Sequence, residues 1–247
     1  MLHEAMLEIK KEHLQRFEQI KKQFLEKTRV PKENNWRRWI NDEIWRYIIE
    51  QVIVVGNSKP AEKFRKDADL KRQVSYEELA KIKDENKVKR KINYVLRAVG
   101  TRYASSNILK CKKTDALAHN LRVLKTFNDG PKGLLRRLSE FEGPFADKRK
   151  IKYLMKNFKY VQSKSARDFL MELGTIKNAI ALDIRIQNIF TKVGVHIPKG
   201  FEGNPKLYDE IERDILEKVC KPLNLIGVEL DRMLYQNYRD ITNMDFS

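Results

Sequence analysis

Apolar residues recur along most of the chain at the spacing of one face of an α-helix. In residues 166–173 and again in 186–193, apolar side chains stand at positions i, i+3, i+4 and i+7. Alternating patterns typical of strands are scarce, and stretches rich in Gly and Pro, such as 128–133, form turns between the helical segments. The pattern therefore predicts an all-α protein.

The same spacing predicts further helices along the chain. They are expected from near Leu14 to before Pro31, from Asn41 to Gly56, at 92–100, at 145–157, at 207–220 and at 225–238. Asn41 is of a residue type that commonly caps helix N-termini, and the glycines at 56 and 174 are expected to end their helices. The polar fragment 105–115 is predicted to be a loop.

The charge of the chain changes this picture of an ordinary helical protein. It has 247 residues with 51 Lys+Arg against 34 Asp+Glu, a formal net charge of +17. Such a field attracts polyanions, so nucleic acid is the first candidate partner. Charged surfaces also occur in thermophile proteins, which would explain 34% charged residues but not the one-sided excess.

Several classes of protein are disfavoured by composition. Cys111 and Cys220, the only cysteines, are far apart, so neither a disulfide framework nor a cysteine metal site is expected. The four histidines have no ligand spacing, and we expect no metal. No apolar run reaches 18 residues, and the N-terminal segment carries charges unlike those of a signal peptide. We expect an intracellular protein that does not enter a membrane.

Two residues stand at unusual places in the helical pattern. Lys164 begins a predicted helix, where the helix dipole disfavours a cation. Asp183 follows 19 residues later, at the start of the next helix. Taken singly, Asp183 could be an ordinary N-cap and Lys164 a solvated lysine. Their pairing at this spacing calls for another explanation.

The residues that flank Lys164 and Asp183 supply an explanation for this pairing. Between 145 and 174 the order is helix, tight connection "FKYVQSK" and helix, with Lys164 at the end of the connection. This arrangement resembles the helix-hairpin-helix DNA glycosylases, particularly the bifunctional 8-oxoguanine DNA glycosylase/AP lyases. Their hairpin reads Leu-x-Gly-Val-Gly-x-Lys and is followed, 18 or 19 residues on in most subfamilies, by an aspartate within Val/Ile-Asp-x-His/Arg. Phe158, Val161, Lys164 and Asp183 take the matching positions, and "LDIRI" completes the second element.

The resemblance implies an architecture and a partner. It covers roughly 42–64 and 141–240. A helical barrel-like subdomain of 41–174 and a second subdomain of 1–40 plus 175–247 would enclose a cleft for damaged double-stranded DNA. A monomer is expected. The four cysteines of endonuclease III are absent, so neither an iron–sulfur cluster nor any other cofactor is implied.

The resemblance also implies a chemistry. The neutral amine of Lys164 would attack the sugar carbon that carries the damaged base, giving a Schiff base and then β-elimination of the strand. Asp183 would stabilise the positive charge that develops on the sugar. A damaged base must leave the helix stack to be reached, so base flipping is implied. Glycosylases for other oxidised or alkylated bases, and a non-catalytic DNA-binding protein, are the alternatives.

Further residues are implied to contact DNA. Asn57 would fill the gap left by the flipped base, although it could equally cap the end of its helix. The other expected contacts to the strand are Lys156, Lys159, Gln162, Ser163, Lys177 and Arg185.

The connection departs from the family at both hairpin glycines, which are replaced by Tyr160 and Gln162. Neither residue type adopts positive φ easily. The backbone of the connection must therefore differ in shape or contain strain.

Overall fold

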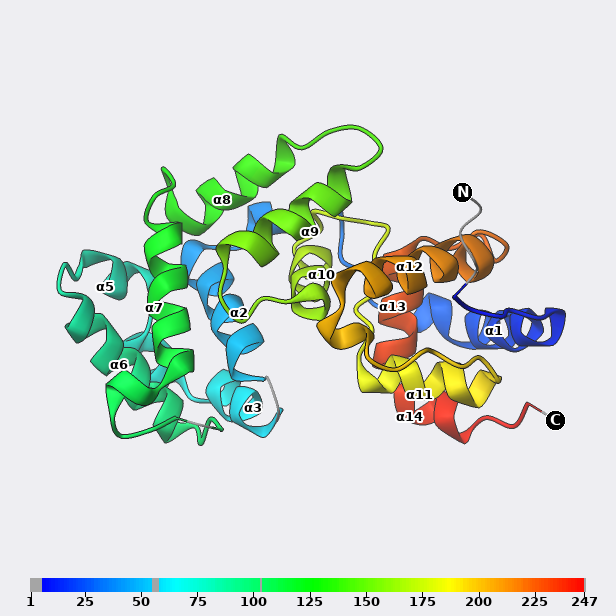
Figure 1. Cartoon of the computed structure of the whole chain (residues 1–247), viewed down its shortest axis with the longest axis horizontal. Coiled ribbons are helices and arrows are strands. Elements are labelled where there is room, and N and C mark those ends of the chain that lie inside the picture. Colours follow the sequence, from blue (N-terminus) through cyan, green and yellow to red (C-terminus); the bar gives the residue numbers. More distant parts are fainter. Residues whose placement is uncertain (1–5, 55–57, 103, 247) are drawn as a thin grey trace. The chain divides into compact units, whose positions relative to one another are not determined.

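The computed structural model describes residues 6–54, 58–102 and 104–246 (Figure 1). All regular elements within these ranges are helices, so the predicted all-α class is confirmed. None of the helices in these ranges is long and apolar enough to cross a membrane.

The helices are α1 (Lys11–Phe24), α2 (Asn41–Ile53), α3 (Lys59–Lys66), α4 (Ala68–Gln73), α5 (Tyr76–Lys81), α6 (Glu85–Ala98), α7 (Lys112–Leu124), α8 (Gly130–Ser139), α9 (Ala146–Asn157), α10 (Ser163–Glu172), α11 (Ile184–Val193), α12 (Pro205–Ile215), α13 (Gly227–Gln236) and α14 (Tyr238–Asn243). Short 3₁₀ turns lie at 25–27, 35–38, 108–110 and 201–203, and a π-helical turn at 216–220 extends α12.

The chain forms two compact units, each described here by itself. One comprises Met1–Glu33 with Leu170–Ser247, and the other comprises Asn34–Phe169. The first has a single apolar core made by α1 and α11–α14, in which the rings of Phe17 and Phe190 lie 5.0 Å apart. Its helices bury the faces that the periodic spacing marks as apolar.

The second unit is built around α2. This helix contacts α3, α5, α7 and α8, and its buried residues lie on more than one face. Trp45 is completely buried, and its indole N–H donates to the carbonyl oxygen of Val74 at 2.9 Å. A helix covered on several sides is apolar on several sides, which explains the dense apolar run in this part of the sequence.

Two predicted non-helical segments are wrong in part. Helix α7 begins at Lys112, inside the fragment predicted as a loop, because Lys113 and Thr114 are buried although their side chains are polar. Helix α8 begins at Gly130 within the predicted turn, with Pro131 in its first turn, where proline is tolerated. Asn41 is the first residue of α2 rather than its cap, which is Ile40.

Candidate active site

Lys164 lies in the first turn of α10, directly after the connection 158–162 that follows α9. Its side chain is half-buried. The described residues form no hydrogen bond or ion pair with its amine. The amine is therefore not held by a carboxylate of the described chain.

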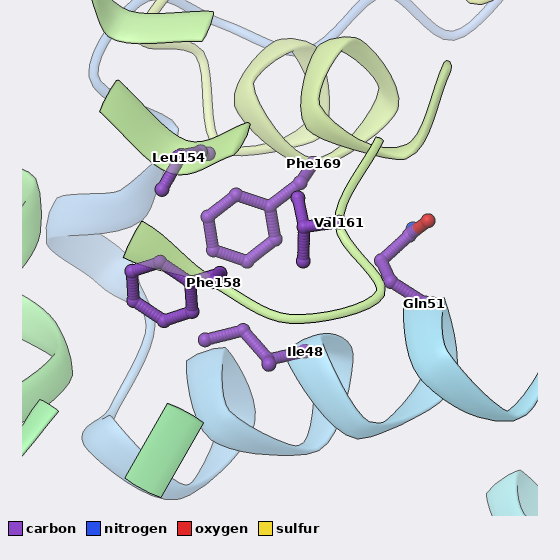
Figure 2. Close-up of a pocket in the computed structure, with 6 residues that line it drawn as sticks. All are labelled: Ile48, Gln51, Leu154, Phe158, Val161 and Phe169. Carbon is purple, nitrogen blue, oxygen red and sulfur yellow. The ribbon is translucent and has the colours of Figure 1, made fainter. Parts of the chain in front are cut away.

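Apolar packing anchors the connection that leads to Lys164. The side chains of Phe158 and Val161 are buried and converge with those of Ile48, Leu154 and Phe169, as Figure 2 shows. The cavity that remains among them has a volume of only ≈ 10 Å³. This space holds at most one water molecule, so it anchors the connection and is too small for a nucleobase.

The backbone of the connection adopts a conformation that glycine would favour. Tyr160 has φ +62°, in the left-handed region, whereas Gln162 does not have a positive φ. The expected departure from the glycine hairpin is therefore a strained tyrosine at the first of the two positions. The N–H of Gln162 donates to the hydroxyl of Ser165 at 2.9 Å, which closes the turn into α10.

Four backbone N–H groups of this segment remain without partners. Those of Tyr160, Val161, Ser163 and Lys164 donate no hydrogen bond to a described residue. Successive free N–H groups at the start of a helix are a common way for proteins to bind anions.

A polar cluster that the sequence did not reveal lies one helical turn beyond Lys164. The Asp168 carboxylate accepts hydrogen bonds from the Tyr47 hydroxyl at 3.0 Å and from the Gln51 amide at 2.7 Å. The ring of Tyr47 stacks on that of Phe169 at 5.7 Å. Figure 2 shows the Gln51 amide turned away from the rings of the small cavity. The only sequence signal was a polar residue, Gln51, inside the apolar pattern of α2.

Asp183 is the N-cap of α11, as its position predicted. Its Oδ1 accepts hydrogen bonds from the N–H groups of Arg185 and Ile186, both at 3.0 Å. Its Oδ2 has no hydrogen bond with the described residues. One carboxylate oxygen thus fixes the side chain, and the other stays available.

The segment before Asp183 is held by buried side chains that sequence reasoning missed. The N–H groups of residues 180–182 donate to the carboxylates of Glu212 and Asp231 and to the hydroxyl of Tyr208, at 2.8, 2.6 and 2.7 Å. These three polar residues lie among the apolar positions of α12 and α13. Their hydrogen bonds fix the backbone that presents Asp183.

Arg185 and Ile184 extend from the same helix start. The Arg185 guanidinium lies over the ring of Tyr235, 4.8 Å from its centroid. Ile184 is 65% exposed. The aromatic contact orients Arg185, and its guanidinium N–H groups form no hydrogen bond with the described residues.

The remaining predicted DNA contacts occupy different environments. Lys156 and Lys159 are exposed beside the connection, whereas the Ser163 hydroxyl is buried and donates to the Met155 sulfur at 3.9 Å. Lys177 is exposed and forms an ion pair with Glu33 at 2.8 Å. Asn57 lies outside the described residues.

The predicted residues divide between the two units. Lys164 belongs to the same unit as Lys156, Lys159, Gln162 and Ser163. Asp183 belongs to the other unit, with Lys177 and Arg185.

No group of three or more His, Cys, Asp or Glu side chains in the described ranges could hold a metal ion. The two cysteines are buried and unpaired with each other. Burial raises the pKa of the Cys220 thiol to about 12, so this thiol stays protonated at neutral pH.

Solved structures resemble the whole chain. The 8-oxoguanine DNA glycosylase of Methanocaldococcus jannaschii superposes with a TM-score of 0.62 at 18% identity, covering 92% of each chain. The 8-oxoguanine DNA glycosylase of Thermotoga maritima has a TM-score of 0.59 at 20% identity, covering 90% of this chain and 92% of its own. The M. jannaschii glycosylase/lyase with a 15mer DNA containing 8-oxoguanine has a TM-score of 0.57 at 16% identity, covering 94% and 99%.

No family model matches the sequence, and no curated protein matches it. The chain has the helical fold of DNA glycosylases. More particularly, its fold is that of the 8-oxoguanine DNA glycosylases, as the residues around Lys164 and Asp183 predicted.

Proposed function

We propose that the chain is a base-excision repair DNA glycosylase with AP lyase activity that removes 8-oxoguanine. One observation carries this proposal: in a fold shared with 8-oxoguanine glycosylases over 92% of the chain, a lysine with no counter-charge among the described residues stands at the start of α10. A lysine amine that no carboxylate of the described residues holds can serve as a nucleophile.

Lys164 is the nucleophile in this proposal. Its amine nitrogen forms a bond to C1′ of the damaged nucleoside while the bond from C1′ to the base breaks, and the bonding electrons leave with the base. Loss of a proton from the nitrogen and opening of the sugar give a Schiff base. Removal of a proton from C2′ then expels the 3′ phosphate, which cleaves the strand by β-elimination.

Asp183 stabilises the positive charge that develops on the sugar. Its Oδ1 is fixed by two backbone N–H groups, so Oδ2 has a defined direction and is free for this role. The role requires the two units to bring Asp183 near the sugar that Lys164 attacks.

DNA is held mainly through its phosphates. The free N–H groups of residues 160, 161, 163 and 164 and the exposed Lys156 and Lys159 form a positive surface at the connection. Arg185 offers a second contact, oriented by Tyr235. The base leaves the stack to reach Lys164, and Asn57 fills the gap.

The proposed substrate, 8-oxoguanine, follows from the 8-oxoguanine DNA glycosylases that share this fold. Glycosylases for other oxidised or alkylated bases remain the alternative within the class. A DNA-binding protein in which Lys164 only contacts phosphate is the alternative outside it.

Reductive trapping tests the proposal. The chain is incubated with duplexes that carry 8-oxoguanine, other oxidised bases, alkylated bases or an abasic site, in the presence of borohydride. A covalent adduct is expected with 8-oxoguanine and with the abasic site, because borohydride reduces the imine to a stable amine. Lys164→Gln should give no adduct and no strand cleavage.

Lys152→Gln is a matched control, since Lys152 is an exposed lysine of α9 that is assigned no role. It should still give the adduct. Full lyase activity in Lys164→Gln, or no adduct from the wild type with any duplex, would show that the assignment is wrong.

A further inference from the structure

The connection 158–162 is clamped by a buried amide from α7. The Asn120 side chain is completely buried, and it pairs with both backbone groups of Lys159. Its Oδ1 accepts from the Lys159 N–H at 2.8 Å, and its Nδ2 donates to the Lys159 carbonyl at 3.0 Å. This pairing resembles that of two antiparallel strands. It fixes the backbone immediately before Tyr160.

The clamp holds Tyr160 in a conformation that a tyrosine rarely adopts. Its φ of +62° is unfavourable for residues with a Cβ atom and costs nothing for glycine. A tyrosine here gives the connection no backbone advantage. What it adds is an aromatic ring at a defined place.

Tyr160 lines a hollow of ≈ 360 Å³ together with Lys110, Lys112 and Lys113. The Tyr160 hydroxyl has no hydrogen-bond partner among the described residues. The hollow is far larger than the ≈ 10 Å³ cavity beneath the connection and can admit a phosphate and part of a sugar.

The three lysines have different roles. Lys113 is 3% exposed, its ammonium donates to the Ile53 carbonyl at 3.3 Å, and burial lowers its pKa. Its ammonium is therefore already engaged within the protein. Lys110 and Lys112 are exposed and form no ion pair with the described residues. They carry the charge that is available to a ligand.

We propose, building on the function proposed above, that Tyr160, Lys110 and Lys112 form a second strand-contact site that binds a DNA phosphodiester and its sugar. The two ammonium groups attract the phosphate, and the tyrosine hydroxyl donates to a phosphate oxygen. The ring packs against the sugar. DNA contact thus extends from the backbone N–H groups of the connection to the start of α7, through a side chain that a glycine hairpin would lack.

The variant Tyr160→Gly distinguishes a DNA-binding role of the tyrosine side chain from a tyrosine that is only tolerated at a strained backbone position. Glycine removes the cost of the left-handed backbone, so the thermal unfolding midpoint should rise. It also removes the ring and hydroxyl, so the Kd for lesion duplex should increase roughly threefold or more. Tyr160→Asn, which tolerates left-handed backbone with less freedom than glycine, should weaken binding similarly. Tyr160→Phe keeps the ring but lacks the hydroxyl, so its Kd should lie between those of the wild type and Tyr160→Gly.

The charge contribution is measured through salt dependence. Lys110→Gln and Lys112→Gln should together reduce the slope of log K against log[salt] by about 0.9 for the one phosphate that they neutralise. Lys22→Gln, an exposed lysine of α1 in the other unit, should leave the slope unchanged.

The second site would be overturned if Tyr160→Gly and Tyr160→Asn bind duplex as tightly as the wild type or more tightly, and if the lysine variants keep the wild-type slope of log K against log[salt]. Borohydride trapping by Lys164 in the wild type tests the glycosylase function separately. The wild type could give the adduct while the Tyr160 and lysine variants bind DNA as the wild type does. That result would count against the second strand-contact site but not against the glycosylase function.

Discussion

The Asp183 carboxylate caps α11 through one oxygen and leaves the other without a hydrogen bond from the described residues. The sequence offered capping and catalysis as competing explanations, because aspartate is common at both kinds of position. In the structure Oδ1 alone accepts both capping hydrogen bonds. Periodicity could locate the residue, but only coordinates could show which oxygen is used.

Asparagine and alanine at position 183 should have different effects. Asp183→Asn keeps a side-chain oxygen for the cap, so the unfolding midpoint should change little. Base excision should fall by about 10²-fold or more, because a neutral amide cannot stabilise a positive sugar. Asp183→Ala loses the cap as well and should cost about 1 kcal/mol of stability. Thermal unfolding and single-turnover excision of 8-oxoguanine measure the two effects.

Equal loss of stability and excision in both variants would support a purely capping role. Lesion-duplex affinity is measured alongside, since the catalytic explanation expects it to survive in Asp183→Asn.

The cluster of Tyr47, Gln51 and Asp168 marks a limit of sequence reasoning at this scale. Asp168 reads as one more charged residue on a solvated helix face. Only the packing of α2 against α10 shows that it accepts two hydrogen bonds. Polar contacts between distant segments leave no periodic signal.

Helices α9 and α10 were predictable as elements because their apolar spacing is regular and their ends are marked. Helix α9 was expected at 145–157 and spans Ala146–Asn157. Helix α7 was not predicted: its first residues fall in the expected loop 105–115, and Lys113, Thr114 and Asn120 are buried polar residues in positions where the helical pattern expects apolar ones. Each of these side chains has a hydrogen-bond partner that only the fold supplies. The same element that escaped prediction supplies the clamp on the connection.

Removing the clamp should affect both stability and DNA binding. Asn120→Ala leaves the two backbone groups of Lys159 without a protein partner, and we expect a loss of about 1–3 kcal/mol in the free energy of unfolding. The connection would also lose its fixed shape, so the Kd for duplex should rise. Denaturant unfolding and fluorescence titration measure the two changes.

Combining Asn120→Ala with Tyr160→Gly provides the check. Because glycine needs no clamp to hold a left-handed backbone, Asn120→Ala should cost less stability in the Tyr160→Gly background than in the wild type. Strict additivity of the two changes would show that Asn120 does not hold Tyr160.

At the scale of the whole molecule, the fold could be anticipated although identity to the matched structures is only 16–20%. Many sequences of suitable apolar pattern and volume fill the same helical core, so a low identity is compatible with a shared fold. The chemical residues do not have this freedom. Lys164 and Asp183, the residues to which we assign chemistry, could therefore indicate the fold when the rest of the sequence could not.

The net charge of +17 leads to the last prediction, which concerns the molecule and no single site. Each phosphate that the protein neutralises releases condensed counterions, so log K for duplex should fall with log[salt] at about −0.9 per phosphate. In the proposed DNA complex, the free N–H groups of residues 160, 161, 163 and 164 would contact phosphate as dipoles, whereas the lysines around them would contribute full charges. Lys156→Gln with Lys159→Gln should therefore lower the slope and weaken binding to undamaged and lesion duplexes by similar factors, because phosphate contacts carry no base information. Titrations at several salt concentrations between about 50 and 200 mM provide the measurement. Binding that stays flat over this range would mean that the charge excess serves another purpose than holding DNA.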